Sequence, residues 1–254
     1  MSIPASKIKF IKSLHRKKYR QKYNNFIVEG DKIAKEMLHS NSLRIEGIYA
    51  TDSWLSTNKA LLKLHESVLF KVSLTELGRI STLKTPNQVL IVAKIPQRNF
   101  PNQHTGFALY LDNIQDPGNM GTILRIADWY GIKTIFASPD TVELYNPKVL
   151  QGSMGAFLRI NVFSTGLQTI REAFPDKVIY GAFMEGESIY NIQKHPDALL
   201  VIGNEGNGIH PDNMPFIDKK ITIPKGKGGG AESLNAGVAT GIICSEFFRE
   251  NPQK

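Results

Sequence analysis

Apolar and polar positions alternate in two different periods along the first 95 residues. Apolar residues at helical spacing (Ile8, Ile11 and Leu14) predict one helix from about Ile3 to Tyr23, and Asp31 can cap a second helix. Short apolar runs predict strands at 26–28, 45–50, 68–72 and 88–95, with further helices at 59–65 and 74–80. This alternation predicts a small α/β layer domain.

A second alternation begins after the polar stretch 96–103, which contains two prolines. That stretch predicts a linker at 97–104 between a domain of residues 1–96 and a domain of residues 105–254. The second domain shows strands at 107–111, 134–137, 178–183, 198–202 and 221–223, with helices at 121–130, 147–157, 168–174 and 234–249. Strands this apolar are typical of a parallel sheet covered by helices on both faces.

Charge is concentrated in one segment. The 31 Lys and Arg exceed the 23 Asp and Glu by eight, and eight cations with no acid lie in residues 7–22. These candidate RNA-binding residues are Lys7, Lys9, Lys12, Arg16, Lys17, Lys18, Arg20 and Lys22. Such a patch favours a nucleic acid, although a solvated helix face or a basic tail remains the alternative. Tyr19 and Tyr23 could stack on bases, whereas Phe10 fits core packing better.

Other features exclude several classes. No run of about 18 apolar residues predicts a membrane span, and the N-terminus lacks an apolar signal core. The single cysteine, Cys244, excludes an internal disulfide and suits the core of an apolar helix. The histidines lack metal-ligand spacing, so no metal is expected, and His210-Pro211 resembles a helix start. A cytoplasmic protein is the best fit.

Three loops follow predicted strands, where open parallel sheets bind ligands. In the first loop, Pro117-Gly118 predicts a turn, and Arg125 on the next helix can face the same cleft as Asn119. The second loop carries three glycines between 203 and 208. Its Glu205 is either a functional carboxylate or, slightly favoured, a tie to a neighbouring amide.

The third loop, 224–235, is rich in lysine and glycine. Ser233 is a candidate N-cap of the last helix, whose small residues Ala236, Gly237, Ala239 and Gly241 allow close packing. The loop lacks the Gly-Lys-Ser/Thr of a Walker motif. No dinucleotide fingerprint occurs either, so a nucleotide-dependent oxidoreductase has little support.

In this order, the three loops resemble the SpoU/TrmH family of RNA ribose 2′-O-methyltransferases in the SPOUT superfamily. The matching segments are Asp116-Pro-Gly-Asn-Met-Gly-Thr-Ile-Leu-Arg125, Gln151-Gly-Ser-Met-Gly-Ala156, Gly203-Asn-Glu-Gly206 and Glu232-Ser-Leu-Asn235. Three ordered motifs over residues 107–248 are far more specific than one glycine loop. The region from Lys7 to Gly30 is similar to the substrate-binding domain of rRNA-directed members.

The resemblance implies an S-adenosylmethionine-dependent enzyme acting on RNA, with large-subunit rRNA as the expected substrate, as a homodimer with a trefoil knot in the catalytic domain. It implies cofactor contacts at Gly203, Ile223 and Leu234. It implies a catalytic and motif-core set of Asn119, Arg125, Glu205, Ser233 and Asn235.

Two departures from the family pattern occur in the third motif. Lys225–Gly230 makes the loop two residues longer than the common spacing, and Ala236-Gly237 replaces the more usual valine-serine pair. Two alternatives stay open at this point: a tRNA ribose methyltransferase, and a non-catalytic RNA-binding protein that kept the fold.

Overall fold

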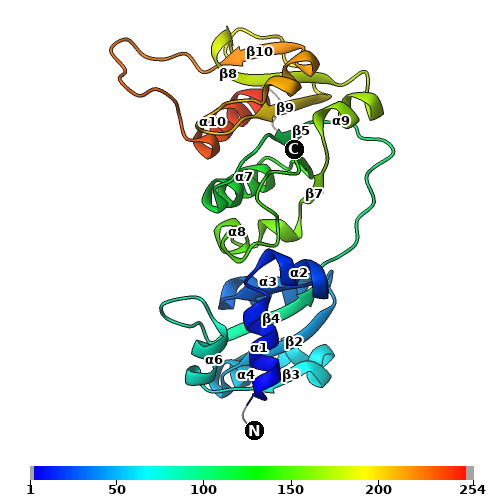
Figure 1. Cartoon of the computed structure of the whole chain (residues 1–254), viewed down its shortest axis with the longest axis vertical. Coiled ribbons are helices and arrows are strands. Elements are labelled where there is room, and N and C mark those ends of the chain that lie inside the picture. The colour runs from blue at the N-terminus through cyan, green and yellow to red at the C-terminus, as the bar shows by residue number, and fades with distance from the viewer. Residues whose placement is uncertain (1–2, 250–254) are drawn as a thin grey trace. The chain divides into compact units, whose positions relative to one another are not determined.

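The computed structural model describes residues 3–249 and divides the chain into two compact units (Figure 1). Unit 1 comprises Met1–Gln97 together with Glu143–Leu158, and unit 2 comprises Arg98–Val142 together with Arg159–Lys254. The chain thus passes from unit 1 to unit 2 within the polar segment expected to be a linker. It also returns to unit 1 for one further segment, which the hydropathy pattern does not indicate.

Unit 1 is built on a four-stranded sheet of order β1-β4-β2-β3. Its pairs β1–β4 and β2–β4 are antiparallel, and β2–β3 is parallel. The strands are β1 (Asn25–Glu29), β2 (Ile45–Ala50), β3 (Leu69–Lys71) and β4 (Val89–Lys94). The helices are α1 (Ala5–Ser13), α2 (Lys17–Tyr23), α3 (Asp31–Ser40), α4 (Asp52–Thr57), α5 (Lys59–Leu62), η1 (Lys63–Val68), α6 (Leu74–Ile80), α8 (Pro147–Ser153) and η2 (Ala156–Leu158).

The prediction of a single helix from Ile3 to Tyr23 was wrong. The chain breaks between α1 and α2, and Arg16 is extended. The carbonyl of Leu14 accepts a hydrogen bond from Arg20 Nη1 at 2.6 Å instead of continuing the helix. Ile11 of α1 and Leu14, the residue that ends this helix, lie in the core of unit 1, where they cluster with buried residues of α6.

Unit 2 is built on a six-stranded parallel sheet of order β10-β8-β9-β5-β6-β7. The strands are β5 (Ala108–Leu111), β6 (Thr134–Ala137), β7 (Asn161–Ser164), β8 (Val178–Ser188), β9 (Ala198–Ile202) and β10 (Lys219–Thr222). The helices are α7 (Pro117–Trp129), α9 (Leu167–Ala173), η3 (Pro211–Phe216) and α10 (Ala236–Phe248). The expected α/β fold with an apolar parallel sheet is confirmed, since β5 and β9 are wholly buried.

Helices cover both faces of this sheet. Ala108 and Tyr110 of β5 cluster with Leu167 and Ile170 of α9. Side chains alternate along a strand, so the other residues of β5 face the opposite side. On that side α7 and α10 lie together (Figure 1). The predicted close packing of α10 is confirmed: a Cβ added at Gly237 would lie 2.9 Å from Thr122 Cγ2 of α7.

Two element boundaries differ from the sequence predictions for identifiable reasons. The predicted turn at Pro117-Gly118 was wrong, because these residues form the first turn of α7. Asp116 caps that helix by accepting the N–H of Asn119 at 2.8 Å, and proline suits the first helical position. Ser233 does not cap α10. Asn235 does, accepting the N–H groups of Gly237 and Val238.

Candidate functional site

The first two motif loops meet at the carboxyl edge of the unit 2 sheet. They follow β5 and β9, which are neighbouring strands, and the N–H of Asp112 donates to the carbonyl of Ile202 at 2.9 Å. The third loop follows β10 and leads into α10. This arrangement places all three motifs where parallel sheets bind ligands.

A chain of hydrogen-bonded side chains joins the three motifs. Asn235 Oδ1 accepts the first amides of α10, and its Nδ2 donates to Asn119 Oδ1 at 2.7 Å. Asn119 Nδ2 in turn donates to Glu205 Oε1. The two ends of the chain fix which atom donates in each bond: the Glu205 carboxylate can only accept, and the α10 amides can only donate. The chain therefore runs from the positive end of α10 to a carboxylate, with both polar atoms of Asn119 engaged.

Glu205 thus binds a neighbouring amide, as the sequence favoured, and this amide is the side chain of Asn119 in the first motif. The second loop is closed instead by its neighbour Asn204. The backbone of Asn204 pairs with Gly208 at 3.0 and 2.9 Å, and Asn204 Oδ1 accepts the N–H of Gly206. Asn204 Nδ2 donates to the carbonyl of Asn113, which links this loop to the first one.

Gly203 is required by the geometry of its own loop. A Cβ at this position would lie 2.3 Å from the carbonyl carbon of Gly208 and 2.5 Å from the nitrogen of Ile209. These contacts are with backbone, so no side-chain rotation relieves them. The glycine therefore shapes the loop whether or not its amide also contacts a cofactor.

The third loop is exposed and has few internal bonds. Among the described residues, one hydrogen bond joins two backbone groups of this loop: the Gly229 N–H donates to the Gly226 carbonyl at 3.1 Å. Leu234 is 45% exposed, Ile223 is partly exposed, and Ser233 is exposed without a side-chain bond among residues 3–249. The third loop thus offers unpaired backbone amides and carbonyls between two accessible apolar side chains.

Arg125 lies in the middle of α7 rather than near its start, and it is exposed. Among residues 3–249 its guanidinium has no hydrogen bond or ion pair, so the structure does not join it to Asn119. Six residues separate the two, about 9 Å along the helix axis and about 120° around it. Arg125 is therefore a cation free to engage an external anion.

Of the eight predicted RNA-binding cations, Arg20 must be withdrawn. Its side chain is 2% exposed and forms an ion pair with Glu143. Lys7 is half-buried, with Nζ 4.5 Å from the ring centroid of Phe70. The exposed cations are Lys9, Lys12, Arg16, Lys17, Lys18 and Lys22.

One residue that the sequence analysis left without a role organises the site. Asp112, 2% exposed, accepts the N–H of His210 at 2.7 Å and Nδ2 of Asn213 at 2.8 Å through one oxygen. It thereby ties the end of β5 to the start of η3, where the predicted helix start at His210-Pro211 is confirmed. A carboxylate directly after a wholly apolar strand was the available signal.

The described residues offer neither a metal-ion cluster nor a membrane-spanning helix. Between residues 3 and 249, no three His, Cys, Asp or Glu side chains gather in a way that could hold a metal ion. No helix in that same range is long and apolar enough to cross a membrane. Cys244 is fully buried as expected, and burial raises the pKa of its thiol.

Comparison with known proteins agrees with this architecture. The SpoU rRNA Methylase family matches residues 106–245, and the MRM3-like substrate binding domain matches residues 5–91. The chain is 31% identical over 245 residues to the 23S rRNA (guanosine(2553)-2′-O)-methyltransferase RlmP of Bacillus subtilis, covering 93% of this chain and 94% of that protein.

Two solved structures share the fold over nearly the whole chain. A TrmH-family protein from Porphyromonas gingivalis superposes with a TM-score of 0.89 at 35% identity, covering 99% of this chain and 100% of the other. An AdoMet-bound rRNA methyltransferase from Sinorhizobium meliloti gives 0.86 at 23% identity, covering 99% and 97%. The family match spans more than half of the residues and contains all three motifs that the hydrogen-bonded chain joins. This chain therefore belongs to the SpoU rRNA methylase family.

Proposed function

We propose that this protein methylates a ribose 2′-hydroxyl of ribosomal RNA, using S-adenosylmethionine, with large-subunit rRNA as the substrate. The observation that carries the proposal is the Asn235–Asn119–Glu205 chain, which holds the three family motifs together at the carboxyl edge of the sheet. Family membership and the similarity to the Bacillus enzyme support both the reaction and the substrate.

We assign the cofactor to the edge formed by the second and third loops. The unpaired backbone groups of the third loop and the accessible side chains of Ile223 and Leu234 fit it, with Gly203 fixing the opposite loop. The bound cofactor supplies a methyl group already activated by a sulfonium. The protein then has mainly to align the ribose oxygen with that methyl group.

In this scheme Arg125 holds the RNA phosphate next to the target ribose and stabilises the charge that develops on the 2′-oxygen. An arginine pKa above about 12 keeps the guanidinium charged, so it acts as a clamp and not as a base. The proton leaves to a phosphate oxygen or to water. Asn119, Glu205 and Asn235 position the loops, and Ser233 is free to contact the substrate.

We propose that residues 1–96 form the RNA-binding domain and residues 105–254 the catalytic domain. The six exposed cations of residues 9–22 would contact phosphates. Tyr19 and Tyr23 stack with ring centroids 6.2 Å apart, and Tyr23 is 37% exposed, which suits stacking on an unpaired base. With bacterial rRNA as its substrate, we expect the protein in the cytoplasm.

We further propose a trefoil-knotted catalytic domain and a homodimer, as family membership implies. Exposed apolar side chains on α7 and α10 support a self-association surface: Trp129 is 85% exposed and Val238 is 50% exposed. Light scattering on the purified protein would report the dimer directly.

The decisive experiment begins with calorimetric titration of the purified protein with S-adenosylmethionine, with ATP and NAD as controls. Binding of S-adenosylmethionine alone is the expected result. Mapping of 2′-O-methylated positions on rRNA from a deletion strain should then show one position lost and restored by the wild-type gene. A folded protein that binds RNA but not S-adenosylmethionine would overturn the enzymatic proposal in favour of an RNA-binding protein.

A further inference from the structure

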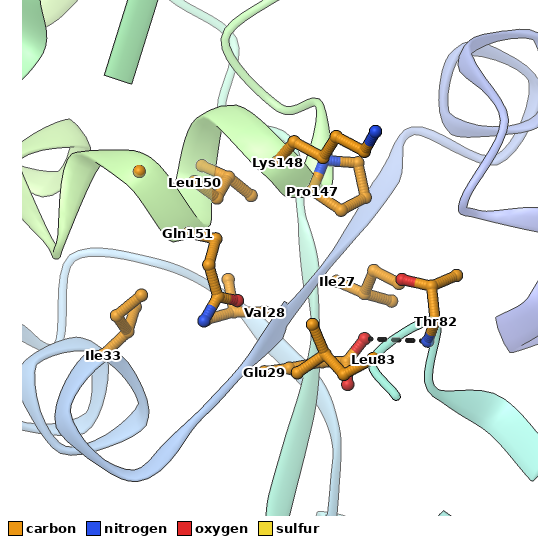
Figure 2. Close-up of a pocket in the computed structure, with 11 residues that line it drawn as sticks. Ile27, Val28, Glu29, Ile33, Thr82, Leu83, Pro147, Lys148, Leu150 and Gln151 are labelled. Atoms are coloured by element: carbon orange, nitrogen blue, oxygen red, sulfur yellow. Dashed lines mark hydrogen bonds between the residues drawn. The ribbon is translucent and has the colours of Figure 1, made fainter. Parts of the chain in front are cut away.

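Unit 1 contains a cavity of about 300 Å³ between β1 and α8 (Figure 2). A volume at the lower end of the range for small-molecule sites, about 300–1,000 Å³, suits one planar ring system. It is lined by residues of β1, α3, the loop at 82–83 and α8.

The walls of this cavity are apolar and fixed. Ile27, Val28, Ile33 and Leu150 are each less than 5% exposed, so they belong to the packed interior of unit 1. Leu83 is partly exposed and completes the wall opposite α8. Walls of this kind accept the faces of a flat ring.

The positive and negative side chains of the cavity lie on opposite sides of it. Lys148 lies on one side and Glu29 on the opposite side, with Gln151 projecting from α8 between them (Figure 2). Glu29 is 8% exposed, and its carboxylate accepts the Ser81 hydroxyl and, at 3.5 Å, the N–H of Thr82. A carboxylate has about four acceptor sites, so two bonds leave it able to accept more.

The rim groups are not committed to other contacts. Within residues 3–249, the Lys148 ammonium and the Gln151 side-chain amide have no hydrogen-bond or ion-pair partner. The carboxylate at one end opposes an anion inside the cavity, whereas the ammonium at the other end attracts one at the rim. A ligand with a donor-bearing ring and an attached phosphate matches this polarity, with its ring inside and its phosphate outside.

We propose that this cavity binds a single unstacked guanine base of the RNA substrate. The two adjacent N–H donors at N1 and N2 of guanine match the Glu29 carboxylate, and Gln151 can bond the remaining ring edge. Lys148 contacts the phosphate. Reading an extruded base by its edge between apolar walls is a common way for proteins to select an RNA nucleotide. The inference rests on the proposed function, because it assumes that RNA is the substrate.

The test compares 12-nucleotide single-stranded RNAs in a fluorescence-anisotropy titration: all uridine, or uridine with one central guanosine, inosine or adenosine. Wild-type protein should bind the guanosine strand roughly tenfold more tightly than the all-uridine strand. Inosine lacks the N2 amino group and should lose most of that preference. Strands carrying 6-thioguanosine should crosslink under near-ultraviolet light to a peptide that contains residues 147–152 or 82–83.

Variants then localise the preference. Gln151→Ala and Glu29→Gln should bring the guanosine-to-uridine ratio close to one while leaving all-uridine affinity unchanged. Leu83→Trp, which fills the cavity, should do the same. The matched control is Gln193→Ala, an exposed glutamine of unit 2, which should preserve the ratio.

The outcomes separate this inference from the proposed function. RNA binding with equal affinity for all strands, or a crosslink confined to residues outside the cavity, would refute the guanine site alone. Failure to bind any strand, with S-adenosylmethionine-dependent methylation of rRNA intact, would refute the guanine site alone, and loss of both would refute the proposed function. The crosslink uses wild-type protein, so a misfolded variant cannot decide the result.

Discussion

Asn119 and Asn235 lie 116 positions apart in the sequence, yet their side chains are joined by a 2.7 Å hydrogen bond. Asn235, the N-cap of α10, donates this bond, and Asn119, in the first turn of α7, accepts it. Each asparagine also holds a further group, the α10 amides or Glu205. The second and third loops, to which we assign the cofactor, are thus coupled through two neutral side chains.

This coupling predicts non-additive effects of substitution. Asn235→Ser keeps an N-cap oxygen but removes the donor to Asn119, and Asn119→Ala removes both its bonds. Residues in direct contact show interaction energies of about 0.5–3 kcal/mol in double-mutant cycles. We expect the double variant to lose less unfolding free energy and less S-adenosylmethionine affinity than the two single losses combined. Strict additivity in urea unfolding and in calorimetry would contradict the coupling.

Arg125→Ala should abolish methyl transfer and leave cofactor binding intact. Its guanidinium is exposed and has no partner among the described residues, so its removal disturbs no internal contact. We expect at least a 100-fold fall in turnover, with an unchanged Kd for S-adenosylmethionine. Arg125→Lys should restore only part of the rate, because an ammonium cannot bond a phosphate in the bidentate manner. Loss of cofactor binding in a folded Arg125→Ala protein would refute this role.

Gly203→Ala and Gly206→Ala form a matched pair within one loop. The Cβ at 203 would meet backbone at 2.3 Å, whereas the Cβ at 206 would meet only Asn204 Oδ1 at 3.5 Å. Overpacking of this kind costs about 1–3 kcal/mol, and open surface positions change stability by about 0.5 kcal/mol or less. Gly203→Ala should lower the melting temperature and weaken cofactor binding, and Gly206→Ala should do neither. Equal effects of the two substitutions would show that the backbone contacts around Gly203 do not explain the need for glycine there.

RNA affinity should depend on salt through the six exposed cations of residues 9–22. If all six contact duplex phosphates, the slope of log affinity against log salt is roughly −5. Replacing Lys17 and Lys18 together by Gln should reduce the slope by roughly two. Arg20 should not contribute to the slope, because it is buried against Glu143. A slope near zero would exclude this patch as the RNA contact.

Acid should destabilise unit 2 through His104. Burial lowers the pKa of His104 from its ordinary value of 6.5, and the nearby Lys177 ammonium acts in the same direction. The unfolded chain therefore binds the proton more readily, and stability is lost as the pH falls through about 6.5. We expect His104→Phe, which keeps a ring beside Phe136, to lose less urea stability than wild type between pH 7.5 and 5.5. Equal losses would show that His104 does not contribute.

Strong local patterns made much of the fold predictable. The strands at 45–50, 134–137 and 198–202 and the helix at 74–80 agree with the structure residue by residue. The helix owes its clear limits to a capping box, in which Ser73 and Glu76 bond one another's backbone. The strand Asn161–Ser164 was missed because it is a partly exposed edge strand without an apolar run.

The sequence allowed prediction of which residues form the site, but not of the hydrogen bonds that join them. Family motifs indicated Asn119, Glu205 and Asn235, but only the fold brings them into one hydrogen-bonded chain. The capping role assigned to Ser233 failed because Asn235, two residues later, satisfies two helix amides at once. Arg20 looked like its cationic neighbours because charge patterning carries no information about burial.

Unit 1 is assembled from two separate segments of the chain, and this affects how it folds during synthesis. A ribosome delivers residues from the N-terminus onward, at roughly 5–20 per second. Arg20 and Phe26 therefore emerge well before the partners that cover them, Glu143, Tyr145 and Phe157. The roughly 60 residues between Gln97 and Leu158 take roughly 3–12 s to synthesise. Until then, the nascent sheet carries an uncompensated guanidinium and a bare aromatic ring, so vectorial folding of unit 1 must wait for part of the catalytic motif region to be translated.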